Sequence, residues 1–115
     1  MVHKIVKYMI KYRLIDQCLQ FLLPLSAQDP RIVTYICDCY IAVDRAKDAI
    51  ILLASKIKDY PYLIPLLLKQ SECFLNTELY EYATKIVKIC LEFCPESFEA
   101  HYIYAQCLFY EKDIQ

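Results

Sequence analysis

The sequence predicts an all-α fold made of stacked helical pairs, and three observations lead to this prediction. The chain of 115 residues is 58% hydrophobic, which is enough apolar material to bury a core. It contains no glycine, although phosphate-binding loops and tight β-hairpin turns depend on residues that accept positive φ. The third observation is an internal repeat, in which the same kinds of residue return at one fixed spacing along the chain.

Four columns of residues recur at this spacing without an insertion, and each has a role in packing two helices. A small residue lies where the first helix of a pair meets the second, and another lies where the second helix crosses back. A large apolar residue fills the gap between the helices. Proline ends the second helix, because it cannot continue the hydrogen-bond ladder. The four columns are Cys37, Ser71 and Ala105; Ala49 and Ala83; Tyr40, Phe74 and Leu108; and Pro61 and Pro95.

The spacing from Pro61 to Pro95 matches the period of the tetratricopeptide repeat, which is about 34 residues. We therefore expect residues 1–115 to form a single domain of tetratricopeptide-type helical hairpins, stacked in a right-handed solenoid. The expected helices are 2–12, 15–28, 31–43, 46–59, 62–76, 79–94 and 97–110. The expected repeats are about 2–29, 30–61 and 62–95, with an incomplete one at 96–115.

Both ends of the array depart from the regular pattern. The step from Pro30 to Cys37 is three residues shorter than the later steps from proline to the small residue, so the first pair is more divergent. The last repeat would lack its second helix, because the chain stops at Gln115, where that helix should begin. Solenoids normally end in a polar capping helix, so we expect this chain to be a piece of a longer protein or a truncated product.

Charge and cysteine content narrow the class of protein. Residues 1–71 carry ten Lys and Arg against six Asp and Glu, whereas residues 72–115 carry three against eight. This polarity could steer a protein partner, but nucleic acid usually requires a clearly basic domain. The start of the chain lacks the apolar stretch of a secretory signal. We therefore expect a soluble chain in a reducing compartment, with its seven cysteines free and mostly buried.

Two cysteine pairs could be half-sites for zinc, which needs four converging ligands. These pairs are Cys37 with Cys39, and Cys90 with Cys94. Residues i and i+2 on one helix point apart, and free cysteine is usually a core residue. We therefore favour buried, unligated thiols over a metal site.

The histidines and paired acids also have structural explanations. His3 and His101 lie far apart without partners in a catalytic order, and we expect His101 to pack where a large aromatic residue usually stands. Glu96 and Glu99 flank a helix start, where the macrodipole favours acids, so capping explains them better than acid–base chemistry. We therefore expect no enzyme, no cofactor or metal, and no small-molecule substrate.

The first helices of such pairs line the concave surface, which is expected here to be mixed in charge and rich in apolar and aromatic groups. A site for a terminal carboxylate would need a cluster of Lys, Arg and Asn. We therefore favour an apolar or extended-peptide ligand. The expected protein-binding residues are Arg31, Asp38, Glu72, Leu75, Tyr102, Gln106 and Phe109.

The N-terminus is basic. Lys4, Lys7 and Lys11 recur at helical spacing with apolar residues between them. This pattern is typical of a basic amphipathic helix that lies on an anionic membrane or binds a partner. It is equally typical of a first repeat helix with a solvated lysine face. Both interpretations stay open, with the three lysines as candidates for membrane contact.

Several stretches go beyond the generic repeat, and the most family-like runs from Pro95 through Ser97 and Phe98 into a helix. The others are 12–14, 28–30, 42–44, 49–53, 60–61, 66–75 and 80–83. With these stretches most of the chain resembles the fungal exomer cargo-adaptor subunits, which are Arf-binding proteins that export chitin synthase. His101 departs from that family, since an aromatic residue is expected there.

The resemblance implies a cytoplasmic, coat-like adaptor that is peripheral at the trans-Golgi network. Such a subunit joins an exomer scaffold subunit and the GTPase Arf, and it binds the tails of cargo proteins for export to the plasma membrane. The resemblance also favours membrane contact slightly, because such coats work against a membrane. The alternative is a generic tetratricopeptide scaffold in another multiprotein assembly.

Overall fold

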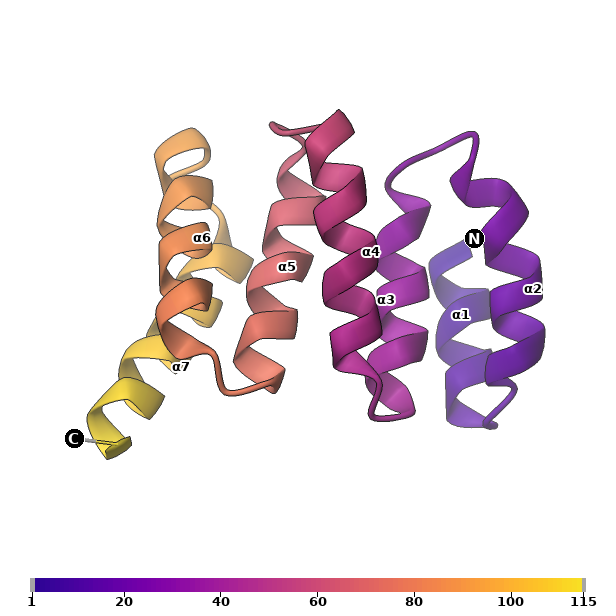
Figure 1. The fold of residues 1–115 in the computed structure, drawn as a ribbon, viewed down its shortest axis with the longest axis horizontal. Helices are drawn as coiled ribbons and strands as arrows, with labels where there is room; N and C mark the ends of the chain where they lie inside the picture. Colours follow the sequence, from indigo (N-terminus) through magenta and orange to yellow (C-terminus); the bar gives the residue numbers. More distant parts are fainter. Residues whose placement is uncertain (1, 115) are drawn as a thin grey trace.

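The computed structural model describes residues 2–114, and side chains up to Glu111, as an array of seven α-helices without a strand. The helices are α1 Val2–Lys11, α2 Ile15–Ser26, α3 Ile32–Ala42, α4 Ala46–Asp59, α5 Ile64–Asn76, α6 Tyr80–Phe93 and α7 Phe98–Ile114. They lie side by side along the longest dimension, with α1 and α2 at one end and α7 at the other (Figure 1). The all-α helical-repeat fold predicted from the sequence is therefore confirmed.

The helix bounds differ from the prediction where proline intervenes. The helix expected at 62–76 begins at Ile64, and Pro65 lies in its first turn, where its missing N–H breaks no helical hydrogen bond. The helix expected at 15–28 ends at Ser26, ahead of Asp29 and Pro30. Asp29 instead accepts the backbone N–H of Arg31 at 3.0 Å and closes the turn into α3. The last helix continues beyond 110 to Ile114.

Each helical pair turns back through a residue with positive φ. Arg13, Asp44 and Glu78 have φ of 60°, 61° and 64°, in the left-handed region that favours glycine. In each turn the following residue donates its N–H to the carbonyl five residues earlier, as in a Schellman motif. These bonds run from Leu14 to Met9 (2.7 Å), from Arg45 to Tyr40 (2.7 Å) and from Leu79 to Phe74 (2.8 Å). The chain therefore makes its tight helical turns without glycine.

Small residues lie between the helices, as the repeat predicts. Ala49 and Ala83 have no exposed surface, which confirms their expected burial. The Cys37 thiol lies 3.9 Å from the Ala49 carbonyl, so a side chain of one helix contacts the backbone of its partner. Ser71 occupies the equivalent position of the next pair and is also fully buried. A larger side chain would force these helices apart.

The cysteines form part of the core. All seven thiols are free, and all but Cys94 are buried. Burial raises the pKa of Cys90 to about 11, and burial together with the Cys18 thiol at 3.3 Å raises the pKa of Cys39 to about 12. The protonated thiol is therefore the stable form of both at neutral pH. No three His, Cys, Asp or Glu side chains gather to hold a metal ion within the described part of the chain.

Candidate protein-binding groove

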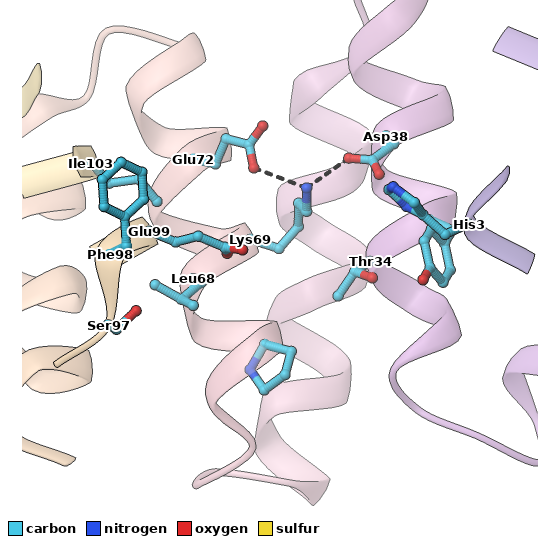
Figure 2. A pocket seen from close by; sticks show the side chains of 12 residues that line it. His3, Thr34, Asp38, Leu68, Lys69, Glu72, Ser97, Phe98, Glu99 and Ile103 are labelled. Carbon is cyan, nitrogen blue, oxygen red and sulfur yellow. Dashed lines mark hydrogen bonds and ion pairs between the residues drawn. The ribbon is translucent and has the colours of Figure 1, made fainter. Parts of the chain in front are cut away.

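A groove runs across the first helices of the pairs. Its larger cavity has a volume of about 620 Å³ and is lined from α1, α3, α5 and α7, together with Ser97 just before α7 (Figure 2). The sequence predicts that the first helices line the binding surface, and this cavity lies on those helices. The lining mixes apolar side chains such as Leu68 and Ile103 with charged ones such as Lys69 and Glu99.

The lining residues follow the sequence repeat. Most of those on α3, α5 and α7 occupy positions with the spacing i, i+3, i+4 and i+7, which lie on one helix face. The four columns are Arg31, Pro65 and Glu99; Thr34, Leu68 and Tyr102; Tyr35, Lys69 and Ile103; and Asp38, Glu72 and Gln106. Each pair therefore adds the same four positions to one face, and the groove is a direct product of the repeat.

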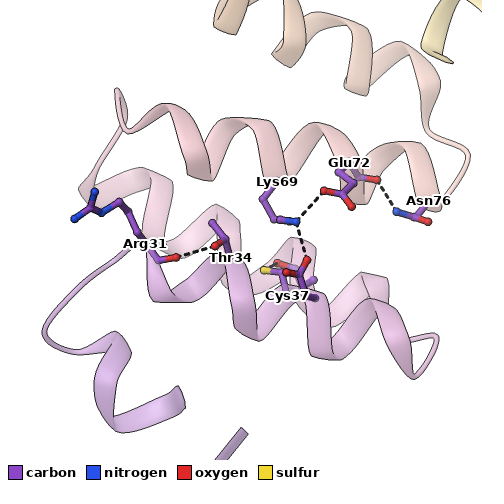
Figure 3. A network of polar contacts seen from close by, with 8 residues as sticks. Arg31, Thr34, Cys37, Lys69, Glu72 and Asn76 are labelled. Atoms are coloured by element: carbon purple, nitrogen blue, oxygen red, sulfur yellow. Dashed lines mark hydrogen bonds and ion pairs between the residues drawn. The ribbon is translucent and has the colours of Figure 1, made fainter. Parts of the chain in front are cut away.

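An ion cluster joins α3 to α5 among the residues that line the larger cavity (Figure 3). The Lys69 ammonium lies 2.7 Å from an Asp38 carboxylate oxygen and 2.9 Å from a Glu72 carboxylate oxygen, so it links α3 to α5. Burial lowers the pKa of Lys69, but the charges of Asp38 and Glu72 outweigh burial and leave the pKa raised. Burial raises the pKa of Asp38, and Lys69 offsets part of that rise.

A second cavity of about 400 Å³ adjoins the first and shares Glu72, Phe98, Glu99 and Ile103 with it. It brings together four of the seven residues expected in the binding surface. These are Glu72, Leu75, Tyr102 and Gln106. None of its lining residues is Lys or Arg, so its charged groups are all acidic.

The other three expected residues are spread out. Asp38 lines the larger cavity. Arg31 lines a neighbouring cavity of about 500 Å³ near α1, and its exposed side chain lies 3.4 Å from Asp29. Phe109 lines neither main cavity; it is 62% exposed and packs edge-on against Tyr110 at 5.5 Å. The structure thus gathers most of the expected residues and leaves Phe109 outside.

Sequence reasoning missed several groove residues, among them His3, Lys69, Phe98 and Glu99. The signal for Lys69 and Glu99 was present, because each stands one repeat period after a residue of the same face, Tyr35 and Pro65 respectively. His3 lies on α1, which belongs to the divergent first pair and offers no column to follow. Aligning the first helices by the repeat, rather than by residue type, would have found Lys69 and Glu99.

The start of α7 corrects the expectation for His101 and adds a cap that was not expected. His101 does not pack in the core: it is exposed, and its ring nitrogen Nε2 lies 2.7 Å from the Pro95 carbonyl. The Ser97 hydroxyl caps α7 by accepting the Ala100 N–H at 3.2 Å. Glu99 lies in the first turn of α7, where the macrodipole favours an acid, as expected. Glu99 also lines both cavities.

The basic residues of α1 lie outside the groove. Lys4 and Lys7 are exposed, and α1 contains no acidic residue. Lys11 is exposed too; it lines a separate cavity of about 560 Å³ together with Arg13 and Arg45. The basic face and the groove are thus two distinct candidate surfaces.

These features define a tetratricopeptide-type helical repeat protein with a groove across its first helices. The crystal structure of the P58(IPK) TPR domain, at 2.5 Å, matches this fold with a TM-score of 0.75 and 15% sequence identity, over 99% of this chain and 34% of that one. At this identity the match shows the fold alone. The chain spans about a third of the length of that solved chain.

The family model of the ChAPs, described as Chs5p-Arf1p-binding proteins, matches residues 1–115. The chain belongs to this family, which confirms the resemblance to Arf-binding exomer subunits. A comparison with curated protein sequences returned no match. The description of this family says that its members bind Chs5p and Arf1p.

Across residues 2–114, no helix combines the length and the apolar content needed to span a membrane.

Proposed function

We propose that this chain is a protein-interaction module of an exomer-type cargo adaptor and has no turnover of its own. The match of the whole chain to the Chs5p-Arf1p-binding family carries this proposal. The proposed partners are therefore a scaffold protein of the Chs5p type and a GTPase of the Arf1p type. The adaptor would act at the cytoplasmic face of the trans-Golgi network and export membrane proteins such as chitin synthase.

The groove supports this function because it suits a segment of another protein. Its two cavities adjoin along the face of four helices and combine apolar, aromatic and charged groups. Extended peptides bind such surfaces through side chains that enter separate pockets. A cargo tail or a partner segment fits this description.

Tyr102 is the aromatic anchor that we propose for partner binding. It is 58% exposed and lines the smaller cavity beside Leu75 and Gln106. A few aromatic residues in the centre of an interface usually supply most of the binding energy. Phe109 is a matched comparison, because it lies on the same helix and is similarly exposed but lines neither cavity.

The test is binding of purified Chs5p and of GTP-loaded Arf1p to the immobilised chain, measured by biolayer interferometry. We expect binding of at least one partner, and we expect Tyr102→Ala to weaken it by roughly tenfold or more at any salt concentration. Phe109→Ala should weaken it less. If neither Chs5p nor Arf1p binds, the exomer function is wrong and the generic tetratricopeptide scaffold is the better interpretation.

We also propose peripheral membrane contact through the basic face of Lys4, Lys7 and Lys11. The exposure of all three lysines and the absence of acids from α1 support it. Each basic residue near an anionic surface contributes about 1 kcal/mol. Replacing the three lysines by Glu should abolish binding to phosphatidylserine vesicles at low salt, and high salt should weaken binding of the unaltered chain. Binding that ignores both changes would contradict membrane contact.

A further inference from the structure

The two cavities of the groove form one channel. Both are lined by Glu72 of α5 and by Phe98, Glu99 and Ile103 of α7. The larger cavity continues across α3 to His3 of α1. A ligand that follows the channel would therefore cross the four first helices in an extended form.

Acidic side chains outnumber basic ones along this channel. Asp38, Glu72 and Glu99 line it, whereas Lys69 is its one Lys or Arg among the described lining residues. Lys69 lies 2.7 Å from Asp38 and 2.9 Å from Glu72, so its single charge is shared between two carboxylates. With three carboxylates and one ammonium, the channel has an excess of two negative charges. His3 does not line the smaller cavity and lies at the other end of the channel.

Glu99 is the carboxylate most available to a ligand. It makes no ion pair or side-chain hydrogen bond with any described residue, and Figure 2 shows its side chain extending from α7 toward α5. Phe98 and Tyr102 line the smaller cavity together with Glu99, and their rings stack with centroids 6.4 Å apart and planes at 13°. A carboxylate next to aromatic faces is a favourable environment for a Lys or Arg side chain.

We propose that the channel binds an extended peptide that carries a Lys or Arg side chain, with the cation held by Glu99 and Glu72 in the smaller cavity. This inference rests on the proposed function, since it names the chemistry of the segment that the interaction module binds. The apolar residues Leu75 and Ile103 in the same cavity provide contacts for the neighbouring side chains of the peptide. A phosphopeptide, a nucleic acid or a terminal carboxylate would instead meet uncompensated acidic groups.

The experiment compares two fluorescein-labelled peptides with blocked ends and alternating leucine and alanine, identical except for a central arginine or a central glutamate. Fluorescence anisotropy should show that the arginine peptide binds roughly tenfold more tightly. Glu99→Gln should remove most of this preference and leave weak apolar binding. The preference should also decline with added salt, because Glu99 is exposed.

Glu96→Gln is the matched control, because Glu96 is exposed and lies three residues before Glu99 but lines neither cavity. It should leave the preference unchanged, and thermal melting checks that both variants fold. Amide NMR shifts caused by the arginine peptide should be largest around Leu75, Tyr102 and Gln106. Equal binding of the two peptides, equal effects of the two variants, or shifts centred elsewhere would overturn the proposal.

The two proposals fail separately. If the chain binds Chs5p or Arf1p but does not distinguish the peptides, the adaptor function stands and the ligand chemistry is wrong. If it distinguishes the peptides but binds neither protein, the cationic-peptide channel stands and belongs to another assembly.

Discussion

The α5–α6 pair and α7 carry the same repeat positions but bury them differently. Ser71 is fully buried within its pair, whereas Ala105, the equivalent residue of α7, is exposed. Phe74 is half-buried, and its ring centroid lies 5.7 Å from that of Tyr82 of α6. The equivalent residue of α7, Leu108, is 41% exposed. These two repeat positions are therefore better buried where the second helix of the pair covers them.

The opposite face of α7 is buried against the α5–α6 pair. Ala100 and Cys107 have no exposed surface, and Ile103 is 8% exposed against the α5–α6 pair. The Thr84 hydroxyl of α6 donates to the Glu111 carboxylate at 3.0 Å. The helix is thus held on one side and open on the other, as expected for a first helix without a described partner.

The largest difference between the two regions should appear on overpacking. Ala83→Trp places a large ring where α6 crosses its neighbours without any exposed surface. Overpacking typically costs about 1–3 kcal/mol, and an array of this size has only a modest free energy of unfolding. We expect the variant to be unfolded or to melt at a much lower temperature, as measured by circular dichroism.

Ala105→Trp is the control for the same substitution on the open face of α7. The ring can extend into solvent there, so the free energy of unfolding should change by less than about 0.5 kcal/mol. If the two variants melt alike, burial at the small-residue positions does not depend on the second helix.

The helices of the fold were predictable from the sequence, because the repeat period indicates which residues are buried, the order of the helices and where the turns lie. Ala49 and Ala83 were correctly assigned to the core from this period alone. The groove was predictable only in part. Its columns follow the same period, yet Lys69 and Glu99 were missed because the columns that begin at Tyr35 and continue from Pro65 were not followed.

Other features depend on contacts that no periodicity shows. The pairing of Lys69 with Asp38 joins residues 31 positions apart on different helices. The 3.3 Å contact of Cys18 with Cys39 depends on how the divergent first pair packs on α3. His101 was expected to pack because a large aromatic residue usually stands at its position, but it is exposed and contacts the Pro95 carbonyl.

The ion cluster distinguishes the same two regions through electrostatics. Lys69 and Glu72 correspond to Ile103 and Gln106 on α7, so the cluster exists between α3 and α5 but not between α5 and α7. Lys69→Met should lower the free energy of unfolding at neutral pH by about 1–2 kcal/mol, since two partly buried carboxylates lose their counter-charge. Urea unfolding at several pH values measures this loss.

The pH dependence of that loss has a definite sign. The pKa of Asp38 is raised in the folded chain because burial disfavours the carboxylate, so its protonated form stabilises the fold at low pH and this stabilisation declines as pH rises. Removing Lys69 removes a charge that lowers this pKa. The loss of unfolding free energy in Lys69→Met should therefore be largest at neutral pH. It should become smaller as the pH falls toward the range in which Asp ordinarily titrates. Lys47→Met, at an exposed lysine of α4 that forms no ion pair with a described residue, should show neither effect.

The smallest expected effect concerns a single hydroxyl in the small-residue column. Ser71 is fully buried, and its hydroxyl oxygen has no hydrogen-bond partner among the described residues. An unsatisfied buried polar group typically costs about 1–3 kcal/mol, and replacing it by an apolar group of similar shape is nearly neutral or stabilising. Ser71→Ala should therefore raise the free energy of unfolding by up to about 1 kcal/mol, as measured by urea denaturation.

The reverse substitution on α7 tests whether burial is the cause. Ala105→Ser adds the same hydroxyl at the equivalent position, where the side chain is exposed and water can satisfy it. It should lower the free energy of unfolding by about 0.5 kcal/mol at most, because serine has a lower helix propensity than alanine. A clear loss of stability in Ser71→Ala would mean that the hydroxyl is bonded in solution, for example to a buried water. If Ser71→Ala raises the free energy of unfolding and Ala105→Ser lowers it, the effect of a hydroxyl at this repeat position depends on whether a second helix covers it.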